Sequence, residues 1–165
     1  MIKPRTGLHF LWLAILTFIL DILTKYFVVT RFSLYDSINI LPIFNLTYVR
    51  NYGVAFSLLA DHSGWQKIFF IGLAIVISLV LLIMLYKNND TQKLQNCAYS
   101  LIIGGALANA TDRAYHGFVV DFFDFYWRDW HYPVFNIADI AICIGATCLV
   151  LDSIKNSDKK SGKKS

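Results

Sequence analysis

Two pairs of acid and amide side chains are the first candidates for chemistry, because each pair has helical spacing and borders an apolar run. Asn109 and Asp112 lie three positions apart at the end of one run, and Arg113 follows directly. Asn136 and Asp139 have the same spacing at the start of another run. Residues three positions apart share one face of a helix, so each amide is expected to point the same way as its acid.

The two aspartates are expected to meet, because the runs that carry them would be antiparallel helices joined by the outer segment 113–135. Adjacent carboxylates cannot both ionise cheaply, so such a pair shares one proton. One member can then act as general base and the other as general acid, which activates water against a peptide carbonyl. Asp112 and Asp139 are therefore the predicted catalytic dyad. Taken singly, each also fits a structural role, Asp112 in an ion pair at a helix end and Asp139 at a helix N-terminus.

A third polar group, Asp21, Thr24 and Lys25, lies inside the first apolar run. Spacings of three and four place these side chains on one helix face. A charge at membrane depth is costly and marks a candidate functional site. An internal ion pair between Asp21 and Lys25, with the ammonium reaching toward the membrane surface, explains the same residues structurally.

Other chemistries are not supported by the sequence. It has no H-E-x-x-H or G-x-S-x-G motif, and its three cysteines lack metal-ligand spacing, so no metal and no cofactor are predicted. The net charge of +4 comes from scattered or terminal basic residues, so no nucleic acid partner is expected. On these residues alone, two other classes stay open: a small membrane transporter with acidic ion sites, and a non-catalytic subunit whose polar residues fix helix packing.

The elements that must position these residues are membrane helices. Hydrophobic residues make up 56% of the chain and its mean hydropathy is +0.51. Helices that cross a membrane need about 20 apolar residues, and four runs suit this role: about 8–29, 68–86, 97–112 and 136–154. The fold class is thus an α-helical integral membrane protein. It forms one membrane-embedded domain over residues 1–155, and the polar tail 156–165 is predicted to be disordered.

Two outer segments connect these helices. Residues 38–59 mix β-branched and aromatic residues with Pro42 and Gly53, which predicts a small β platform at the membrane interface. Residues 113–135 are rich in aromatic side chains, which favour headgroup depth. This segment is predicted to be an interfacial loop or helix, acting either as an anchor or as a lid over a substrate.

The basic residues predict the orientation. Nine fall on one side of the helices and five on the other, with Lys25 inside the first helix. The side with more Lys and Arg is cytoplasmic, so both termini are expected in the cytoplasm. The nine are Lys3, Arg5, Lys87, Lys93, Lys155, Lys159, Lys160, Lys163 and Lys164.

Five blocks, in order along the whole chain, resemble the bacterial lipoprotein signal peptidase family, also called signal peptidase II. They are D-x-x-T-K at 21–25, R-N-x-G-x-A-F at 50–56, G-G-A to N-x-x-D-R at 104–113, V-D-F-F at 120–123 and F-N-x-A-D at 135–139. Any one block is a weak match, but five in the right order are specific. The resemblance implies an aspartic endopeptidase of the cytoplasmic (inner) membrane, with its active site at the extracytoplasmic face.

The resemblance also implies roles for single residues. Asp112 and Asp139 match the catalytic pair, and Asp21, Lys25 and Gly53 are expected to give structural support. Ala108 departs from the family, which usually has Gly there, and we expect only a small adjustment. Positions expected to contact substrate or support the dyad are Asn51, Asn109, Arg113 and Asn136.

The implied substrate is a prolipoprotein signal peptide, cleaved just before a cysteine that already carries diacylglycerol. A helix on one side and a lipid on the other would hold that bond at the surface of the phospholipid bilayer. The family is inhibited by globomycin, a cyclic peptide that occupies the substrate site, so sensitivity to globomycin-type inhibitors is expected.

Overall fold

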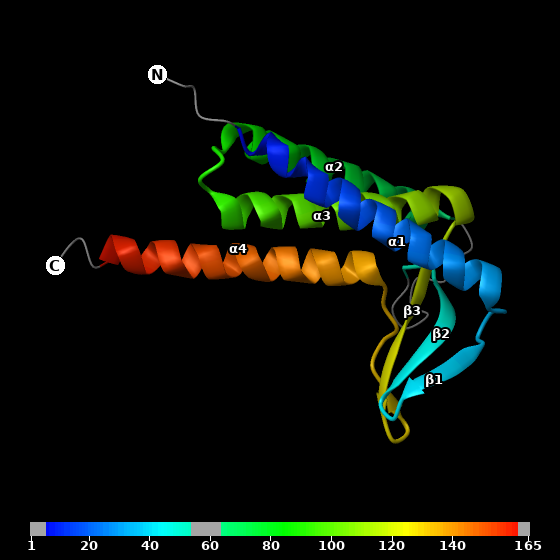
Figure 1. Cartoon of the computed structure of the whole chain (residues 1–165). Helices are drawn as coiled ribbons and strands as arrows, with labels where there is room; N and C mark the ends of the chain where they lie inside the picture. Colours follow the sequence, from blue (N-terminus) through cyan, green and yellow to red (C-terminus); the bar gives the residue numbers. More distant parts are fainter. Residues whose placement is uncertain (1–5, 54–63, 162–165) are drawn as a thin grey trace.

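Four helices lie side by side and a small sheet extends from one end of the bundle (Figure 1). The computed structural model describes residues 6–53 and 64–161. The start of the 3-10 turn at Gly7 and the end of α4 at Ser161 lie at the end of the bundle away from the sheet. The elements are a 3-10 turn Gly7–Phe10, α1 Leu11–Arg31, β1 Ser37–Leu41, β2 Phe44–Asn51, α2 Trp65–Lys87, α3 Lys93–His116, β3 Val119–Trp127, β4 Trp130–His131 and α4 Ile137–Ser161.

Three of the helical stretches are long and apolar enough to cross a membrane. They are Gly7–Arg31, Trp65–Lys87 and Ile137–Asn156, with mean hydropathies of 1.9, 3.2 and 2.0. The remaining helix, α3, is much less apolar. It packs against each of the other three helices, so most of its surface faces protein. A helix in that position does not need the lipid-compatible surface of α2. This explains why α3 can be less apolar than the other helices and still lie inside the bundle.

Two adjacent glycines let α3 approach its neighbours closely. A Cβ on Gly104 would lie 2.5 Å from the carbonyl oxygen of Ala14 in α1, and one on Gly105 would lie 2.5 Å from that of Ala138 in α4. Membrane helices commonly use small residues for such close contacts. The glycines therefore let α3 pack closely against the first half of α1 and against the start of α4.

The sheet is antiparallel, with strand order β1-β2-β3-β4. β1 and β2 confirm the predicted platform over its first part, and residues 54–59 of that segment lie outside the described residues. The prediction of a loop or interfacial helix for 113–135 is wrong over β3 and β4. Residues up to His116 extend α3, and β3 pairs with β2 from Asn51↔Val119 to Phe44↔Phe125. Paired strands satisfy backbone groups that an aromatic loop would leave exposed.

A small apolar cluster joins the sheet to the bundle. It contains Val28 from α1, Tyr48 from β2, and Val120 and Phe122 from β3, each 3% exposed or less. At the opposite end, α4 continues to Ser161. Residues 156–161 therefore extend the helix where a disordered tail was predicted, and 162–165 lie outside the described residues.

Candidate active site

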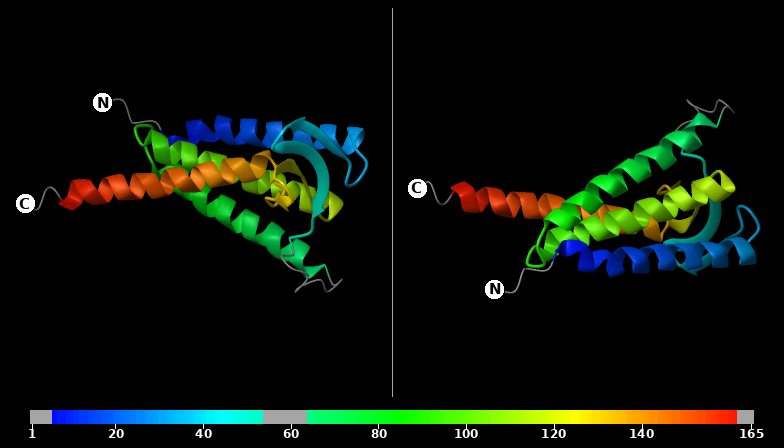
Figure 2. Two further views of the ribbon diagram at one scale, coloured as in Figure 1. Left: turned by 90° about the horizontal axis from the view of Figure 1, so that it is seen from below. Right: turned by 90° about the horizontal axis from the view of Figure 1, so that it is seen from above.

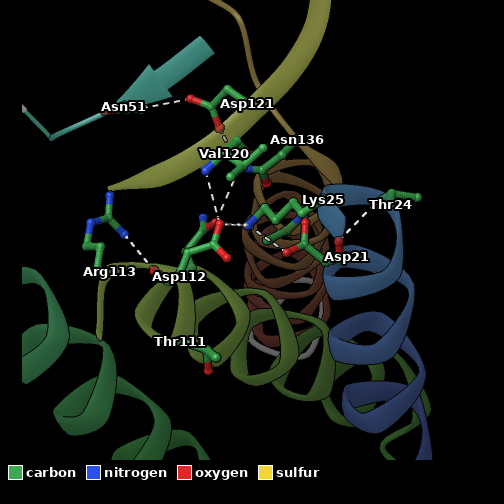
Figure 3. A network of polar contacts seen from close by, with 12 residues as sticks. Asp21, Thr24, Lys25, Asn51, Thr111, Asp112, Arg113, Val120, Asp121 and Asn136 are labelled. Atoms are coloured by element: carbon green, nitrogen blue, oxygen red, sulfur yellow. Dashed lines mark hydrogen bonds and ion pairs between the residues drawn. The ribbon is translucent and has the colours of Figure 1, made fainter. Parts of the chain in front are cut away.

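Polar side chains from α1, α3, β3 and α4 form one hydrogen-bonded network where the bundle meets the sheet (Figure 3). Lys25 lies at its centre and is 2% exposed. Its ammonium is 2.6 Å from Asp21 Oδ2 and 3.1 Å from Asp112 Oδ2. It also donates a 2.8 Å hydrogen bond to Asn109 Oδ1. One buried cation thus contacts two acids and an amide. The predicted Asp21–Lys25 ion pair is present, but the ammonium is buried and does not reach toward the membrane surface.

Asp112 is tied to the structure around it. Its side chain is buried, and Oδ2 accepts a 3.0 Å hydrogen bond from the backbone N–H of Val120 in addition to the Lys25 contact. These two interactions connect the end of α3 to the start of β3. Both contacts are made to one carboxylate oxygen, so the Asp112 side chain is held in place at this junction.

The N-terminus of α4 is capped twice. Asn136 Oδ1 accepts from the Asp139 N–H at 3.0 Å, and Asp139 Oδ2 accepts from the Asn136 N–H at 3.2 Å. This reciprocal pair is a capping box, and it explains why these residues are three positions apart. Asp21 Oδ1 of α1 accepts from the next free donor, Ala138 N–H, at 2.7 Å. The cap therefore orients the Asp139 carboxylate as it starts the helix.

Asn109 has an amide orientation fixed by its neighbours. Its Oδ1 accepts from Lys25 Nζ at 2.8 Å and from Asn136 Nδ2 at 3.2 Å, and both are groups that only donate. The Asn109 Nδ2 group must then face the other way, where it donates to Asp139 Oδ1 at 2.8 Å. The side-chain amide of Asn109 therefore links the Lys25 ammonium to the Asp139 carboxylate through two hydrogen bonds.

A third carboxylate, Asp121 of β3, lies in the same network and is 1% exposed. Its Oδ1 accepts from Asn136 Nδ2 at 2.6 Å and its Oδ2 from Asn51 Nδ2 at 2.9 Å. Burial raises the pKa of the Asp121 carboxyl from 3.8 to about 7. The hydrogen bond from Asn51 opposes this rise, and the negative charge of Asp139 adds to it. At neutral pH Asp121 is therefore divided between its acid and carboxylate forms.

The outer side of the site is formed by Asn51, Gly53 and Arg113. Asn51 Oδ1 accepts a 2.8 Å hydrogen bond from the Gly53 N–H. Gly53 has φ +79°, and a Cβ there would lie 2.5 Å from the Phe70 ring, so this turn requires glycine. Arg113 stacks on the same ring at 4.8 Å and donates to the Asn109 carbonyl oxygen at 3.3 Å. These contacts bring the start of α2 against the network.

The structure gathers all the predicted site residues around one network but does not place the predicted dyad in direct contact. Within the described residues, no hydrogen bond joins Asp112 to Asp139, and Lys25 and Asn109 lie between them. Asp121 was not predicted as a site residue. Its signal in the sequence was an acid in the V-D-F-F block, among aromatic residues that suggested an anchor. The described residues hold no group of three His, Cys, Asp or Glu side chains suited to a metal ion.

Comparisons with known proteins agree on one family. A sequence model described as signal peptidase (SPase) II matches residues 13–155. The chain is 68% identical to a lipoprotein signal peptidase of Actinobacillus succinogenes, over 96% of this chain and 97% of that protein. It is 69% identical to a lipoprotein signal peptidase of Haemophilus influenzae, over 96% of this chain and 92% of that protein.

Solved structures support the same assignment. A structure described as a bacterial membrane enzyme superposes with a TM-score of 0.84 at 32% identity, covering 97% of this chain and 96% of the other. A second structure of the same description gives 0.81 at 31% identity, with 94% and 98% covered. The match spans the helices and the sheet together. The chain therefore belongs to the signal peptidase II family of aspartic peptidases and is a multi-pass bacterial membrane protein.

Proposed function

We propose that this peptidase hydrolyses prolipoproteins just before the diacylglyceryl-modified cysteine, and that Asp139 and Asp121 form the acid pair that activates water. The observation that carries the proposal is the buried Asp121 carboxyl, whose pKa of about 7 lies where an acid–base group works best at neutral pH. Asn136 contacts both members, through its side chain to Asp121 and through its backbone to Asp139.

Sequence analysis paired Asp139 with Asp112, and that pairing stays a prediction. The contacts of Asp112 argue against it, because an ammonium and a backbone N–H occupy one of its carboxylate oxygens and tie the side chain to Lys25 and to β3. Among the described residues, the hydrogen bonds to Asp121 come from two neutral amides. A group that must gain and lose a proton is better served by the second environment. We infer that Asp112 positions β3, and hence Asp121, and does not itself transfer the proton.

The chemistry needs one proton shared by the pair. The ionised member takes a proton from water as the water oxygen attacks the scissile carbonyl carbon. The protonated member gives its proton to the departing amide nitrogen as the C–N bond breaks. The pair gains one proton from water and loses one to the amine, so it again holds one shared proton. Water is the nucleophile, so no covalent intermediate is formed. The half-buried Asp139 is the member more open to a substrate.

We infer that all four helices span the bilayer, including α3, which the other three shield from lipid. Both termini then lie in the cytoplasm, in keeping with nine basic residues at that end and five at the other. The acid network lies at the opposite end of the bundle, next to the sheet. The exposed aromatic residues of the sheet, including Phe125, Trp127 and Trp130, suit the headgroup region. A bond held there by a lipid anchor would reach the acid pair.

The test is cleavage of a purified diacylglyceryl-modified prolipoprotein in detergent by wild type and by Asp139→Asn, Asp121→Asn and Asp112→Asn. We expect wild type to cleave and to be blocked by globomycin. We expect Asp139→Asn and Asp121→Asn to lose at least a hundredfold in rate, which is the order of a lost acid or base. Asp112→Asn should lose less activity than either and should lose thermal stability in parallel.

Each outcome has a distinct meaning. Full activity of Asp121→Asn together with an inactive, folded Asp112→Asn would restore the pairing predicted from the sequence. Equal cleavage of lipidated and unlipidated substrate would show that the lipid is not recognised. A folded wild type that cleaves neither substrate would reject the proposed substrate.

A further inference from the structure

An open cavity of about 610 Å³ lies at the end of the bundle away from the acid network. α3 forms its floor, and α2 and α4 form its sides. These two helices run at an angle to each other (Figure 2), and neither is extensively packed against the other. The residues around it are Leu81, Met84, Gln95, Tyr99, Leu149, Asp152, Ser153 and Asn156.

Asp152 is the one charged residue in that lining. Its Oδ2 accepts from Gln95 Nε2 at 2.5 Å and from Asn156 Nδ2 at 2.9 Å. Both donors are neutral amides, and in the described part of the chain no basic side chain forms an ion pair with this acid. The two donors share one oxygen, and no hydrogen bond from a described residue reaches the other carboxylate oxygen. The cavity is therefore suited to a cationic side chain whose methylene groups, or whose neighbouring residues, contact the apolar lining.

The spacing along α4 indicates what that cation would be. Asp152 follows Asp139 by 13 positions on the same helix, which is about 20 Å along the helix axis. A secretory signal peptide has a positively charged segment followed by 7–15 apolar residues and then the cleavage site. If its scissile bond lies at Asp139 and its apolar part runs antiparallel to α4, its basic segment reaches the depth of Asp152.

We propose that this cavity is a second recognition site for substrate, in which Asp152 pairs with a lysine or arginine that precedes the apolar part of the signal peptide. The inference rests on the proposed function, because it takes the substrate and the position of the scissile bond from it. Leu81, Met84 and Leu149 would cover the first apolar residues. The Asp152 contact at the cytoplasmic end and the acid pair at the outer end would together determine which peptide bond of the substrate is cleaved.

The test compares two lipidated substrates, one with lysines in the segment before the apolar stretch and one with glutamines there. For wild type we expect a lower KM with the lysine substrate and a similar kcat. Asp152→Asn keeps the shape and the hydrogen bonds from Gln95, so it should fold. It should raise KM for the lysine substrate about two- to fivefold, the size of a partly exposed ion pair, and leave the glutamine substrate unchanged.

Two further variants isolate the charge. Asp90→Asn removes an acid from the turn between α2 and α3 at the same end of the bundle, outside the cavity lining, and should change neither KM. Asp152→Lys should reverse the preference, so that a substrate with glutamates in this segment becomes the better one. Binding of an uncleavable signal peptide with lysines or glutamines, measured by fluorescence in detergent, should follow the same order without any cleavage step.

The proposal is overturned if wild type binds and cleaves both substrates equally, or if Asp152→Asn and Asp90→Asn have the same effect. In either case cleavage still takes place, so the proposed function survives. Absence of cleavage by folded wild type with every substrate would instead remove the proposed function, whereas the peptide-binding order would still report on the cavity.

Discussion

Two halves of one polar network use the same residue type for different purposes. In the first half, Asp21 and Asp112 contact a buried ammonium and backbone N–H groups. In the second half, Asp121 and Asp139 contact side-chain amides and the backbone of the α4 cap. The first half holds α1, α3, β3 and the start of α4 together through these contacts. In the second half, no lysine or arginine of the described residues forms an ion pair with either acid, which suits the shared proton that the proposed acid pair requires.

The largest expected effect separates the halves by activity. Asp121→Asn should lower the rate of prolipoprotein cleavage at least a hundredfold, because the remaining acid has no partner with which to share a proton. Its unfolding temperature in detergent should stay close to that of wild type, since the amide still bonds one of its two neighbours. A parallel loss of folding and activity would place Asp121 in the structural half instead.

The next effect separates the halves by stability. Lys25→Met removes the cation that neutralises two buried acids and should cost about 3–5 kcal/mol, seen as a fall in unfolding temperature in detergent. Lys25→Arg, which keeps the charge, is the matched control and should recover part of the loss. A Met variant as stable as wild type would mean that Asp21 and Asp112 do not depend on this ammonium.

The pH dependence of stability tests the proton on Asp121. The folded state holds this proton up to a pKa of about 7, whereas an unfolded aspartate releases it near 3.9. Between these values the folded state binds more protons, so this residue makes stability fall as pH rises from about 4 to about 7, and not beyond. Thermal unfolding of wild type and Asp121→Asn across this range should show a slope in wild type that the variant lacks.

The smallest expected effect concerns Ala108, which is fully buried in α3. Ala108→Gly restores the residue usual in the family and removes one methyl group. Glycine costs about 1 kcal/mol in a helix interior, so a slight drop in unfolding temperature is expected with near-normal cleavage. A large change in cleavage rate would show that this methyl group adjusts the position of the neighbouring Asn109.

The helices could be predicted from the sequence because lipid demands long apolar runs, and α1, α2 and α4 satisfy that demand directly. α3 was predicted too short because the residues that extend it at its two ends, 93–96 and 113–116, are mostly polar and do not continue the apolar run. β3 was missed because its aromatic residues resemble those of an interfacial segment. Its pairing with β2 depends on residues about 70 positions away, such as Asn51 with Asp121, which local patterns do not reveal.

The sequence predicted which residues belong to the candidate site better than it predicted which of them contact one another. Helical spacing correctly grouped Asn109 with Asp112 and Asn136 with Asp139 on facing helix ends. Spacing cannot tell which acid is neutralised, because that depends on where the Lys25 ammonium lies in three dimensions. It also gives no weight to an acid in a strand, which is how Asp121 was overlooked. The four aspartates differ in the groups that contact them, and these contacts cannot be read from their positions in the sequence.

The Asp21–Lys25 pair has a consequence for how the chain enters the membrane. These residues are one helical turn apart in α1, and their charged atoms are 2.6 Å apart. During synthesis α1 emerges before α3 and α4, which later supply Asp112, Asn109 and the Ala138 N–H. A span that carries its own counter-ion has no net charge at that stage, so it can partition into lipid while it waits for its later partners. In the folded chain the pair stays closed, and the same two side chains also contact Asp112, Asn109 and the Ala138 N–H, so a contact that aids insertion also anchors the mature site.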